Sequence, residues 1–295
     1  IVFGDWSSDV CSSDLAPGEI ATHDKGLAQM TQERQLRHVT LQVELQEPLS
    51  TGSDQPVTAV DHTGSRNELT YAVLTAAGRL TVQRARGHRN MLTGAVTYRT
   101  SAGTVPCEAR HTLPAQVKLT GLGDNLYVIW PDGILQRFDT RDLDAIHQVE
   151  TVDLTPAPGV EVSAIGFMIG KTTLLVGDTS GHVTGWFRVR PDAVTHNPDL
   201  QLSMRQVRLG ADGANLGQFG PVRVADIRSA DGFALVPARR LAAPDSGAPV
   251  VSLSPSQRQR LFVVGHADGR IRVHNATIER TLLEVQLPNA APVDI

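Results

Sequence analysis

Residues 261–275 read LFVVGHADGRIRVHN, two short apolar runs separated by a glycine-containing segment. Alternation of apolar and polar residues is typical of a β-strand with one buried face, and a glycine between two such runs predicts a tight turn. Gly269 suits that turn because a tight hairpin needs a residue with positive φ, which a Cβ disfavours. The stretch therefore predicts an antiparallel hairpin.

The same hairpin pattern occurs three more times along the chain. The other copies are LTYAVLTAAGRLTVQRA from Leu69, NLYVIWPDGILQRFD from Asn125 and TLLVGDTSGHVTGWF from Thr173, with the turn glycines Gly78, Gly133 and Gly181. A short strand that opens with valine precedes each copy, at residues 57–60, 117–120, 162–165 and 250–253. A fourth strand is expected after each hairpin, for example at residues 92–98 and 281–287.

The spacing of these repeats predicts the architecture. Val117 and Val162 are 45 residues apart, and Pro249 and Pro292 are 43 apart, both within the ~40–45 residues of a four-stranded propeller blade. The interval that starts at Val57 is 60 residues, so that blade carries an insertion. We therefore predict an all-β chain, a WD-like β-propeller with about four blades. No blade ends its third strand with Trp-Asp, so the period alone gives no tighter assignment.

The interval from Val162 to Val250 is 88 residues, which fits two blades or one blade with a long insertion. Residues 210–220 and 242–247 have the composition of loops, so we favour one blade with an insertion at about 197–247. PVRVADI at 221–227 imitates a first strand and keeps the two-blade alternative open. The last residues, 291–295, repeat the opening of a blade, so 57–295 are predicted to form an incomplete propeller with a truncated fifth blade.

The first 56 residues lie outside the repeats. Residues 5–15, DWSSDVCSSDL, have no apolar period and resemble the conceptual translation of a sequencing adapter, so 1–15 are left out of the fold prediction as artefactual or disordered. Residues 16–56 are predicted to be a lead-in segment with one strand at 39–45 and one candidate helix at 22–36. Without residues 5–15, Cys107 is the only cysteine, which excludes an intramolecular disulfide and a cysteine-based metal site.

The composition narrows the classes of function. The chain is 41% apolar and 20% charged, which is enough apolar material for a sizeable core. A formal charge of −4 argues against a broad nucleic-acid surface. The longest uncharged apolar stretch, 162–170, is well short of the ~20 residues that a membrane helix needs. We predict no nucleic-acid partner and no membrane span in this part of the chain.

Three short segments imitate ligand-binding loops. Residues 166–172, GFMIGKT, resemble a phosphate-binding P-loop, but three residues instead of four separate the glycines, and a strand instead of a helix is predicted after Lys171. Residues 210–220 lack the strand and helix of a dinucleotide site. Residues 178–181 lack the spacing of a calcium loop. We interpret all three as turns or loops.

Two groups of charged or ligand-type side chains invite a functional interpretation. His266 and His274 flank a predicted turn with Asp268, but no third soft ligand is near them in sequence. Three arginines form a basic patch without aromatic neighbours, which predicts a solvated blade surface: Arg84, Arg86 and Arg89. We therefore predict no catalytic, cofactor-binding or metal-binding residue, no cofactor and no enzymatic activity.

One stretch carries a family resemblance. Residues 265–284 combine Gly265 and Gly269 with the run ATIERTLL at 276–283. This pattern resembles a propeller-like soluble domain of some proteobacterial phosphate ABC transporter permease subunits. LLVGDTSGHVTGWF at 174–187 is the next-best match, and Ile278 stands where that family leads us to expect serine.

The resemblance implies a non-catalytic docking or regulatory module in the import of inorganic phosphate across the inner membrane. The implied partners are a second permease subunit, the transporter ATPase and a phosphate-binding protein, and the implied location is an inner-membrane complex with this domain in the periplasm. Two alternatives stay open: a free-standing WD-like propeller scaffold for protein–protein interaction, and a propeller enzyme with its active site in further blades. The reading frame downstream of Ile295 distinguishes the three, because only the permease continues into several membrane helices.

Overall fold

The structure, a computed structural model, describes residues 54–65, 67–94, 96–107, 115–193, 197–210, 213–256 and 258–288. The predictions for residues 1–53, including the candidate helix at 22–36 and the strand at 39–45, lie outside the described residues. The predicted start of a fifth blade at 291–295 also lies outside them.

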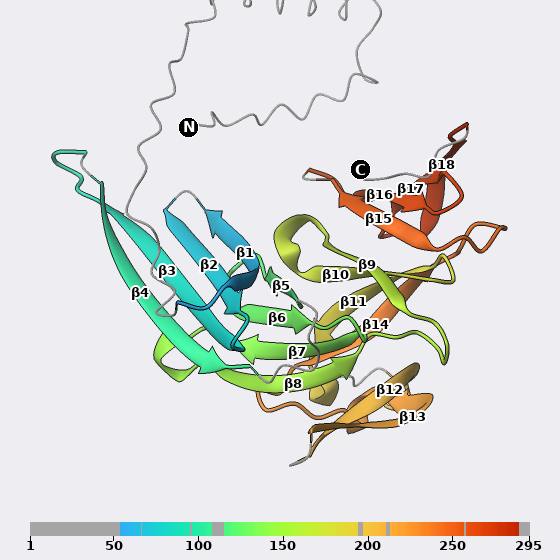
Figure 1. The fold of residues 1–295 in the computed structure, drawn as a ribbon, viewed down its shortest axis with the longest axis horizontal. Helices are drawn as coiled ribbons and strands as arrows, with labels where there is room; N and C mark the ends of the chain where they lie inside the picture. The colour runs from blue at the N-terminus through green and yellow to red at the C-terminus, as the bar shows by residue number, and fades with distance from the viewer. Residues whose placement is uncertain are drawn as a thin grey trace, which may run out of the picture. The chain divides into compact units, whose positions relative to one another are not determined.

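The described residues contain four antiparallel sheets of four strands each, which we call blades 1 to 4 (Figure 1). Blade 1 is β1 (Val57–Ser65), β2 (Glu68–Thr75), β3 (Arg79–Arg89) and β4 (Val96–Pro106). Blade 2 is β5 (Gln116–Leu119), β6 (Asn125–Ile129), β7 (Ile134–Asp139) and β8 (His147–Asp153). Blade 3 is β9 (Val162–Phe167), β10 (Thr173–Asp178), β11 (Val183–Val189) and β14 (Ala234–Leu241), and blade 4 is β15 (Val250–Pro255), β16 (Leu261–His266), β17 (Arg270–Asn275) and β18 (Arg280–Gln286).

Each blade is an antiparallel meander, in which the four strands lie side by side in the order in which they follow one another along the chain. The predicted first strands lie in β1, β5, β9 and β15, and the first strands of adjacent blades pack together, β1 on β5 and β9 on β15. The all-β, WD-like propeller prediction is therefore confirmed. In the part of the chain that the structure describes, no helix has the length and apolar character to cross a membrane.

The four predicted turn glycines lie between the second and third strands of their blades. Their φ values are +71°, +82°, +86° and +82° for Gly78, Gly133, Gly181 and Gly269. A Cβ on Gly181 would lie 2.6 Å from the Ala248 carbonyl oxygen. Backbone conformation and space both require glycine there.

The fourth strand of blade 1 is not where the sequence placed it. β3 continues to Arg89, and the chain begins to reverse at residues 90–94, so β4 begins at Val96 instead of residue 92. The Asn90 side chain fixes this reversal, because its Oδ1 accepts hydrogen bonds from the amides of Leu92 (2.9 Å) and Thr93 (3.2 Å). The fourth strand of blade 4, β18, does lie at the predicted residues.

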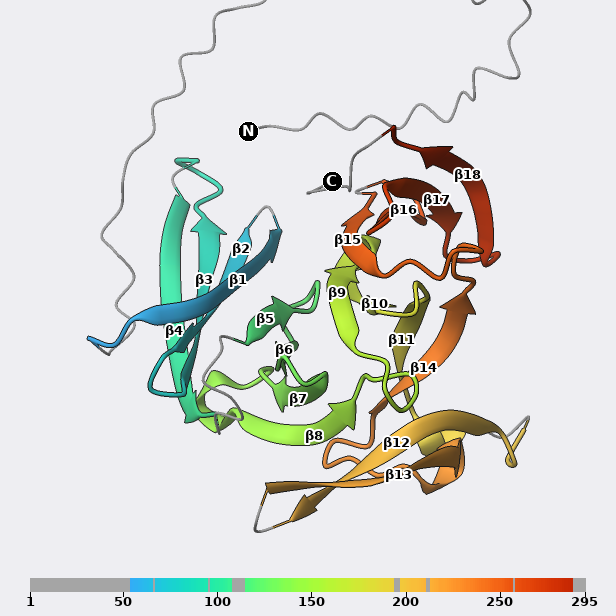
Figure 2. The same cartoon turned by 45° about the vertical axis from the view of Figure 1, so that its right-hand side comes forward.

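The 88-residue interval is one blade with an inserted hairpin. In the sequence, the hairpin, β12 (Gln201–Gly210) with β13 (Gly213–Arg223), follows the third strand of blade 3 and precedes the fourth, and in space it forms a separate two-stranded sheet outside the blade (Figure 2). The predicted insertion at 197–247 was too long, because β14 within it pairs with β11. PVRVADI was not a first strand either: Val222 pairs with Leu202 in the hairpin, and both pack on the neighbouring core, which accounts for the apolar alternation.

The apolar core lies between the blades. Leu80 and Val82 of blade 1 share a cluster with Phe138 of blade 2. Blades 2 and 3 share a second cluster, which also receives Met204 from the inserted hairpin. Blades 3 and 4 share a third cluster around Phe262. Each interface between adjacent blades is therefore a packed contact between sheet faces.

Candidate functional site

The segment that imitates a P-loop is the turn between β9 and β10. A short 3-10 turn, η2 (Ile169–Lys171), follows β9, and strand β10 begins at Thr173, so no helix N-terminus is available for a phosphate. The Lys171 ammonium donates to the His62 carbonyl of blade 1 at 2.6 Å and lies 3.9 Å from the Asp61 carboxylate. Lys171 thus connects two blades instead of facing a ligand.

His266, Asp268 and His274 have separate surroundings. Nδ1 of His266 lies 3.0 Å from the Ala248 carbonyl oxygen, and the His274 ring stacks on Phe262 at 5.3 Å. Burial lowers the pKa of His274 to about 4, so this ring is neutral at physiological pH. Asp268 is exposed and accepts a hydrogen bond from the Arg270 amide within the turn. Among the described residues, no three potential ligands are grouped to hold a metal ion.

The prediction of a solvated arginine patch is wrong for one of its three members. Arg84 is buried, 7% exposed, and its Nη2 donates to the carbonyls of Gly123 (2.9 Å) and Thr140 (3.0 Å). It satisfies loop carbonyls of blade 2 that packing removes from water, so it is part of the contact between blades 1 and 2. Arg86 and Arg89 are exposed as predicted, and Arg86 pairs with Glu68 at 2.9 Å.

The two other loop-like segments also have structural roles. Residues 213–220 of the glycine-containing segment 210–220 belong to strand β13 of the inserted hairpin, so the prediction of a flexible loop there was wrong. Asp178 ends β10, and its Oδ1 accepts from the amides of Ser180 (2.9 Å) and His182 (3.1 Å). This carboxylate stabilises the turn at Gly181, as an aspartate in that position commonly does.

A buried ion cluster joins blade 2 to the chain that returns from the inserted hairpin. Arg137 on β7 is fully buried, and its Nε donates to Glu150 on β8 at 2.8 Å. Its Nη1 donates to Asp231 at 2.6 Å and to Asn125 at 2.8 Å, and its Nη2 donates to Asp231 at 2.8 Å and to the Phe233 carbonyl at 2.5 Å. All five guanidinium donors are therefore used within the chain.

The two carboxylates of this cluster titrate differently. Burial raises the pKa of Glu150 to about 7, against the lowering effect of the Arg137 charge. Burial acts in the same direction on Asp231, but hydrogen bonds from Arg137 and its charge dominate there and lower that pKa to about 2. The cluster has no donor left for a ligand, so we assign it to folding. The cluster could not be predicted from the sequence because Asp231 lies 94 residues from Arg137.

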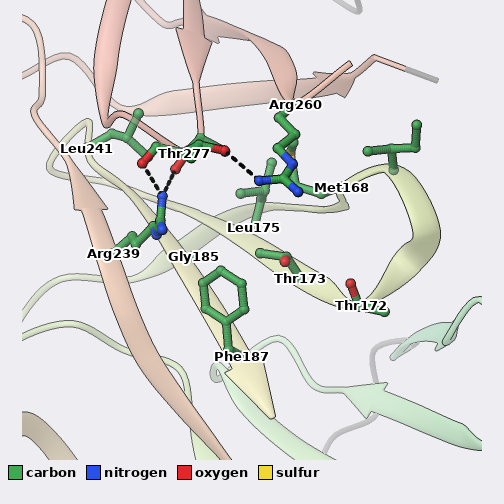
Figure 3. Close-up of a pocket in the computed structure, with 12 residues that line it drawn as sticks. Met168, Thr172, Thr173, Leu175, Gly185, Phe187, Arg239, Leu241, Arg260 and Thr277 are labelled. Atoms are coloured by element: carbon green, nitrogen blue, oxygen red, sulfur yellow. Dashed lines mark hydrogen bonds between the residues drawn. The ribbon is translucent and has the colours of Figure 1, made fainter. Parts of the chain in front are cut away.

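An open pocket of about 360 Å³ lies between blades 3 and 4 (Figure 3). Its walls come from the η2 turn, β10, β11 and β14 of blade 3, and from the turns before β16 and after β17 of blade 4. The lining residues are Met168, Ile169, Thr172, Thr173, Leu175, Gly185, Phe187, Arg239, Leu241, Arg260, Ala276 and Thr277. Two stretches that the sequence analysis singled out for other reasons, 166–172 and 276–283, thus meet at one site.

Arg239 holds the two blades together at this pocket. Its guanidinium lies over the Phe187 ring, 6.0 Å from the centroid, and donates to the carbonyl oxygens of Ala276 (2.6 Å) and Thr277. Its Nε lies 3.8 Å from the Glu279 carboxylate. Because these carbonyls belong to blade 4 and Arg239 to blade 3, the side chain fixes the width of the pocket.

Arg260 is the second cation of the pocket and is much less engaged. The side chain is exposed, and Nη1 lies 3.3 Å from the Thr277 hydroxyl oxygen. Figure 3 shows Arg239 and Arg260 on opposite sides of Thr277. Met168, Leu175 and Leu241 are buried and supply an apolar floor. The pocket therefore presents a positive charge beside an apolar cavity.

No protein-family model matches the chain, and no curated protein matches it. Remote similarities to solved structures exist. They include the β-propeller domain of Myceliophteria thermophila Cps50 (Swd1), at 14% identity and a TM-score of 0.39 over 75% of this chain. They also include the RRP9 WD40 repeats, at 12% and 0.42 over 80%, and Chaetomium thermophilum Raptor, at 14% and 0.44 over 81%.

The chain covers 54%, 52% and 17% of those three proteins' chains, respectively. Similarity this remote carries no argument about function, and the propeller fold rests on the four sheets themselves. No comparison supports the resemblance to phosphate transporter permeases, which rests on the sequence of residues 265–284 and, more loosely, 174–187.

Proposed function

We propose that this chain is a non-catalytic propeller scaffold that binds other proteins. The observation that supports this function is the pocket between blades 3 and 4, where an apolar floor lies beside the exposed Arg260 guanidinium. Protein interfaces concentrate their binding energy in such pockets, where a partner side chain is desolvated and a charged group at the rim fixes its orientation.

The framework around the pocket suits this role. Both walls are four-stranded sheets whose shared core is buried, so the pocket exists before a partner arrives and little ordering is needed on binding. Ile169, 40% exposed, lines the pocket on the η2 turn and extends the apolar surface outward. An exposed apolar group next to a preformed pocket is typical of an interaction surface.

Site-specific photocross-linking in the source cells tests the proposal. We would place a photoreactive phenylalanine at Ile169 in the full chain, and at the β3–β4 tip residue Met91, 91% exposed, as a control far from the pocket. Covalent protein adducts from position 169 but not from 91 are expected. Adducts from neither position contradict the scaffold, and adducts from 91 alone place the binding surface elsewhere.

A second candidate is the soluble domain of a phosphate ABC transporter permease subunit, favoured by the run at 265–284. In that case the adducts would be the partner permease, the transporter ATPase or the phosphate-binding protein, and the domain would lie in the periplasm. Coding sequence beyond Ile295 that continues into several hydrophobic segments of ~20 residues supports this candidate. A stop codon after two or three further blades supports the free-standing scaffold. New acid, base or metal-binding motifs in those further blades would support a propeller enzyme instead.

The side of the membrane has its own test. A reporter that fluoresces only in the cytosol, and separately alkaline phosphatase, would be inserted into the 197–220 segment of the intact protein. Phosphatase activity without fluorescence supports the periplasmic location. Fluorescence would place the domain beside the ATPase instead.

A further inference from the structure

We propose that the pocket between blades 3 and 4 binds a short linear peptide in which an acidic residue lies next to a large apolar one. The carboxylate pairs with Arg260, and the apolar side chain fills the cavity over Met168, Leu175 and Leu241. This inference rests on the proposed scaffold function and names the chemistry of its partner.

The charges of the lining select an anion. Among the residues that the structure describes, two arginines and no carboxylate line the pocket. Arg239 contacts the carbonyls of Ala276 and Thr277, the Phe187 ring and the Glu279 carboxylate, so its guanidinium is already engaged within the chain. Arg260 makes one long contact, to Thr277, and has the donors to take a carboxylate in a paired, two-bond geometry.

The cavity selects an apolar neighbour for that anion. A volume of about 360 Å³ accommodates one large side chain together with part of its backbone. The floor is apolar and buried, so a leucine or phenylalanine side chain placed there leaves water, and this burial favours binding. Thr172 and Thr173 line the same space, and their hydroxyls can take up peptide N–H and C=O groups.

Gly185 permits a variant that closes the cavity without altering its charge. A Cβ built on Gly185 has Arg239 Cβ at 3.7 Å, and Phe187 Cε2 and Thr173 Cγ2 at 3.8 Å, all of them lining residues. The Cβ itself fits at ordinary contact distance, while the two methyl groups of valine must extend into the space between these neighbours. Gly185→Val is therefore expected to fill the cavity, and Gly185→Ala is its matched control.

Arg260 has a matched control on the same turn. Arg258 is exposed like Arg260, lies two residues away and does not line the pocket. Arg260→Ala and Arg258→Ala remove the same charge from the same turn. Only the first removes the proposed carboxylate partner.

The experiment is selection of a random dodecapeptide phage library on the full chain, followed by affinity measurement with synthetic copies of the enriched peptides. Enrichment of peptides with Asp or Glu next to Leu, Ile, Met or Phe is expected. Arg260→Ala and Gly185→Val should each weaken their binding about tenfold or more, while Arg258→Ala and Gly185→Ala should leave it within about twofold. Phosphoserine in place of the acidic residue should not bind more tightly.

Each other result overturns the inference. Enriched peptides without an acidic residue, or acidic peptides that bind Arg260→Ala as well as the parent chain, exclude the proposed recognition. A strong preference for phosphoserine makes the site a phosphopeptide site. If no peptide is enriched, or if Gly185→Val binds normally although thermal melting shows it is folded, the pocket is not the site. Cross-linked partners from other surface positions would then leave the scaffold function standing without this pocket.

Discussion

Replacing Arg137 with methionine should strongly destabilise the fold. The substitution keeps an unbranched apolar stem and removes a guanidinium that makes five hydrogen bonds, three of them to the carboxylates of Glu150 and Asp231. Both carboxylates have 5% side-chain exposure, so water cannot replace the lost charge. Removing one partner of a buried ion pair typically costs about 3–5 kcal/mol, and we expect a loss in that range.

Urea unfolding of the parent chain and of Arg137→Met, followed by circular dichroism, measures this loss. Arg141→Met is the control. Arg141 lies just after the same strand, is exposed and pairs with Asp139, so its replacement should change the stability little. The loss should be largest above pH 7 and should shrink as the pH falls, because Glu150, with a pKa of about 7 beside Arg137, takes up a proton and then leaves no buried charge. An Arg137→Met chain within about 1 kcal/mol of the parent would refute the assignment of this cluster to folding.

Three further changes have defined outcomes. The pKa of His274 falls from 6.5 to about 4 on folding, so between pH 6.5 and 4 the unfolded chain binds more protons than the folded chain. Stability should therefore drop by up to about 3 kcal/mol as the pH falls through this range. In melting curves recorded at several pH values, His274→Gln should make this drop smaller. Gly181→Ala should lose about 1–3 kcal/mol in urea unfolding, because φ is +86° and the Cβ meets a carbonyl, whereas Gly220→Ala has open space. Arg239→Ala should lose about 1.5–3 kcal/mol by the same assay, and a loss below 0.5 kcal/mol would show that its carbonyl contacts do not hold blades 3 and 4 together.

The blades could be predicted from the sequence because their signals are local. A strand with period-two alternation and a turn glycine lie within about fifteen residues of one another, and backbone sterics at positions such as Gly181 act on those residues alone. The boundaries of β4 were missed because an asparagine-stabilised reversal at Asn90 has no distinct hydrophobic pattern. The inserted hairpin was missed because glycine-rich strands have the composition of loops.

The pocket could not be predicted, since its residues are brought together only by the packing of two blades. Met168 and Thr277 are more than a hundred positions apart, and neither carries a motif that points to the other. The same holds for Arg84, whose sequence neighbours gave it the pattern of a surface residue although loop carbonyls of another blade surround it. Periodicity determines which face of a strand is buried, but not which side chains meet across two sheets.

A charge exchange at Arg260 tests the central claim most directly. Two peptides would be compared by fluorescence anisotropy: an acidic–apolar peptide enriched on the parent chain, and its analogue with lysine in place of the acidic residue. Each peptide would be titrated with the parent chain and, separately, with Arg260→Glu. We expect the parent chain to prefer the acidic peptide by about tenfold or more, and Arg260→Glu to prefer the lysine analogue. If Arg260→Glu keeps the same preference for the acidic peptide, that result contradicts the claim that this pocket binds a carboxylate through Arg260.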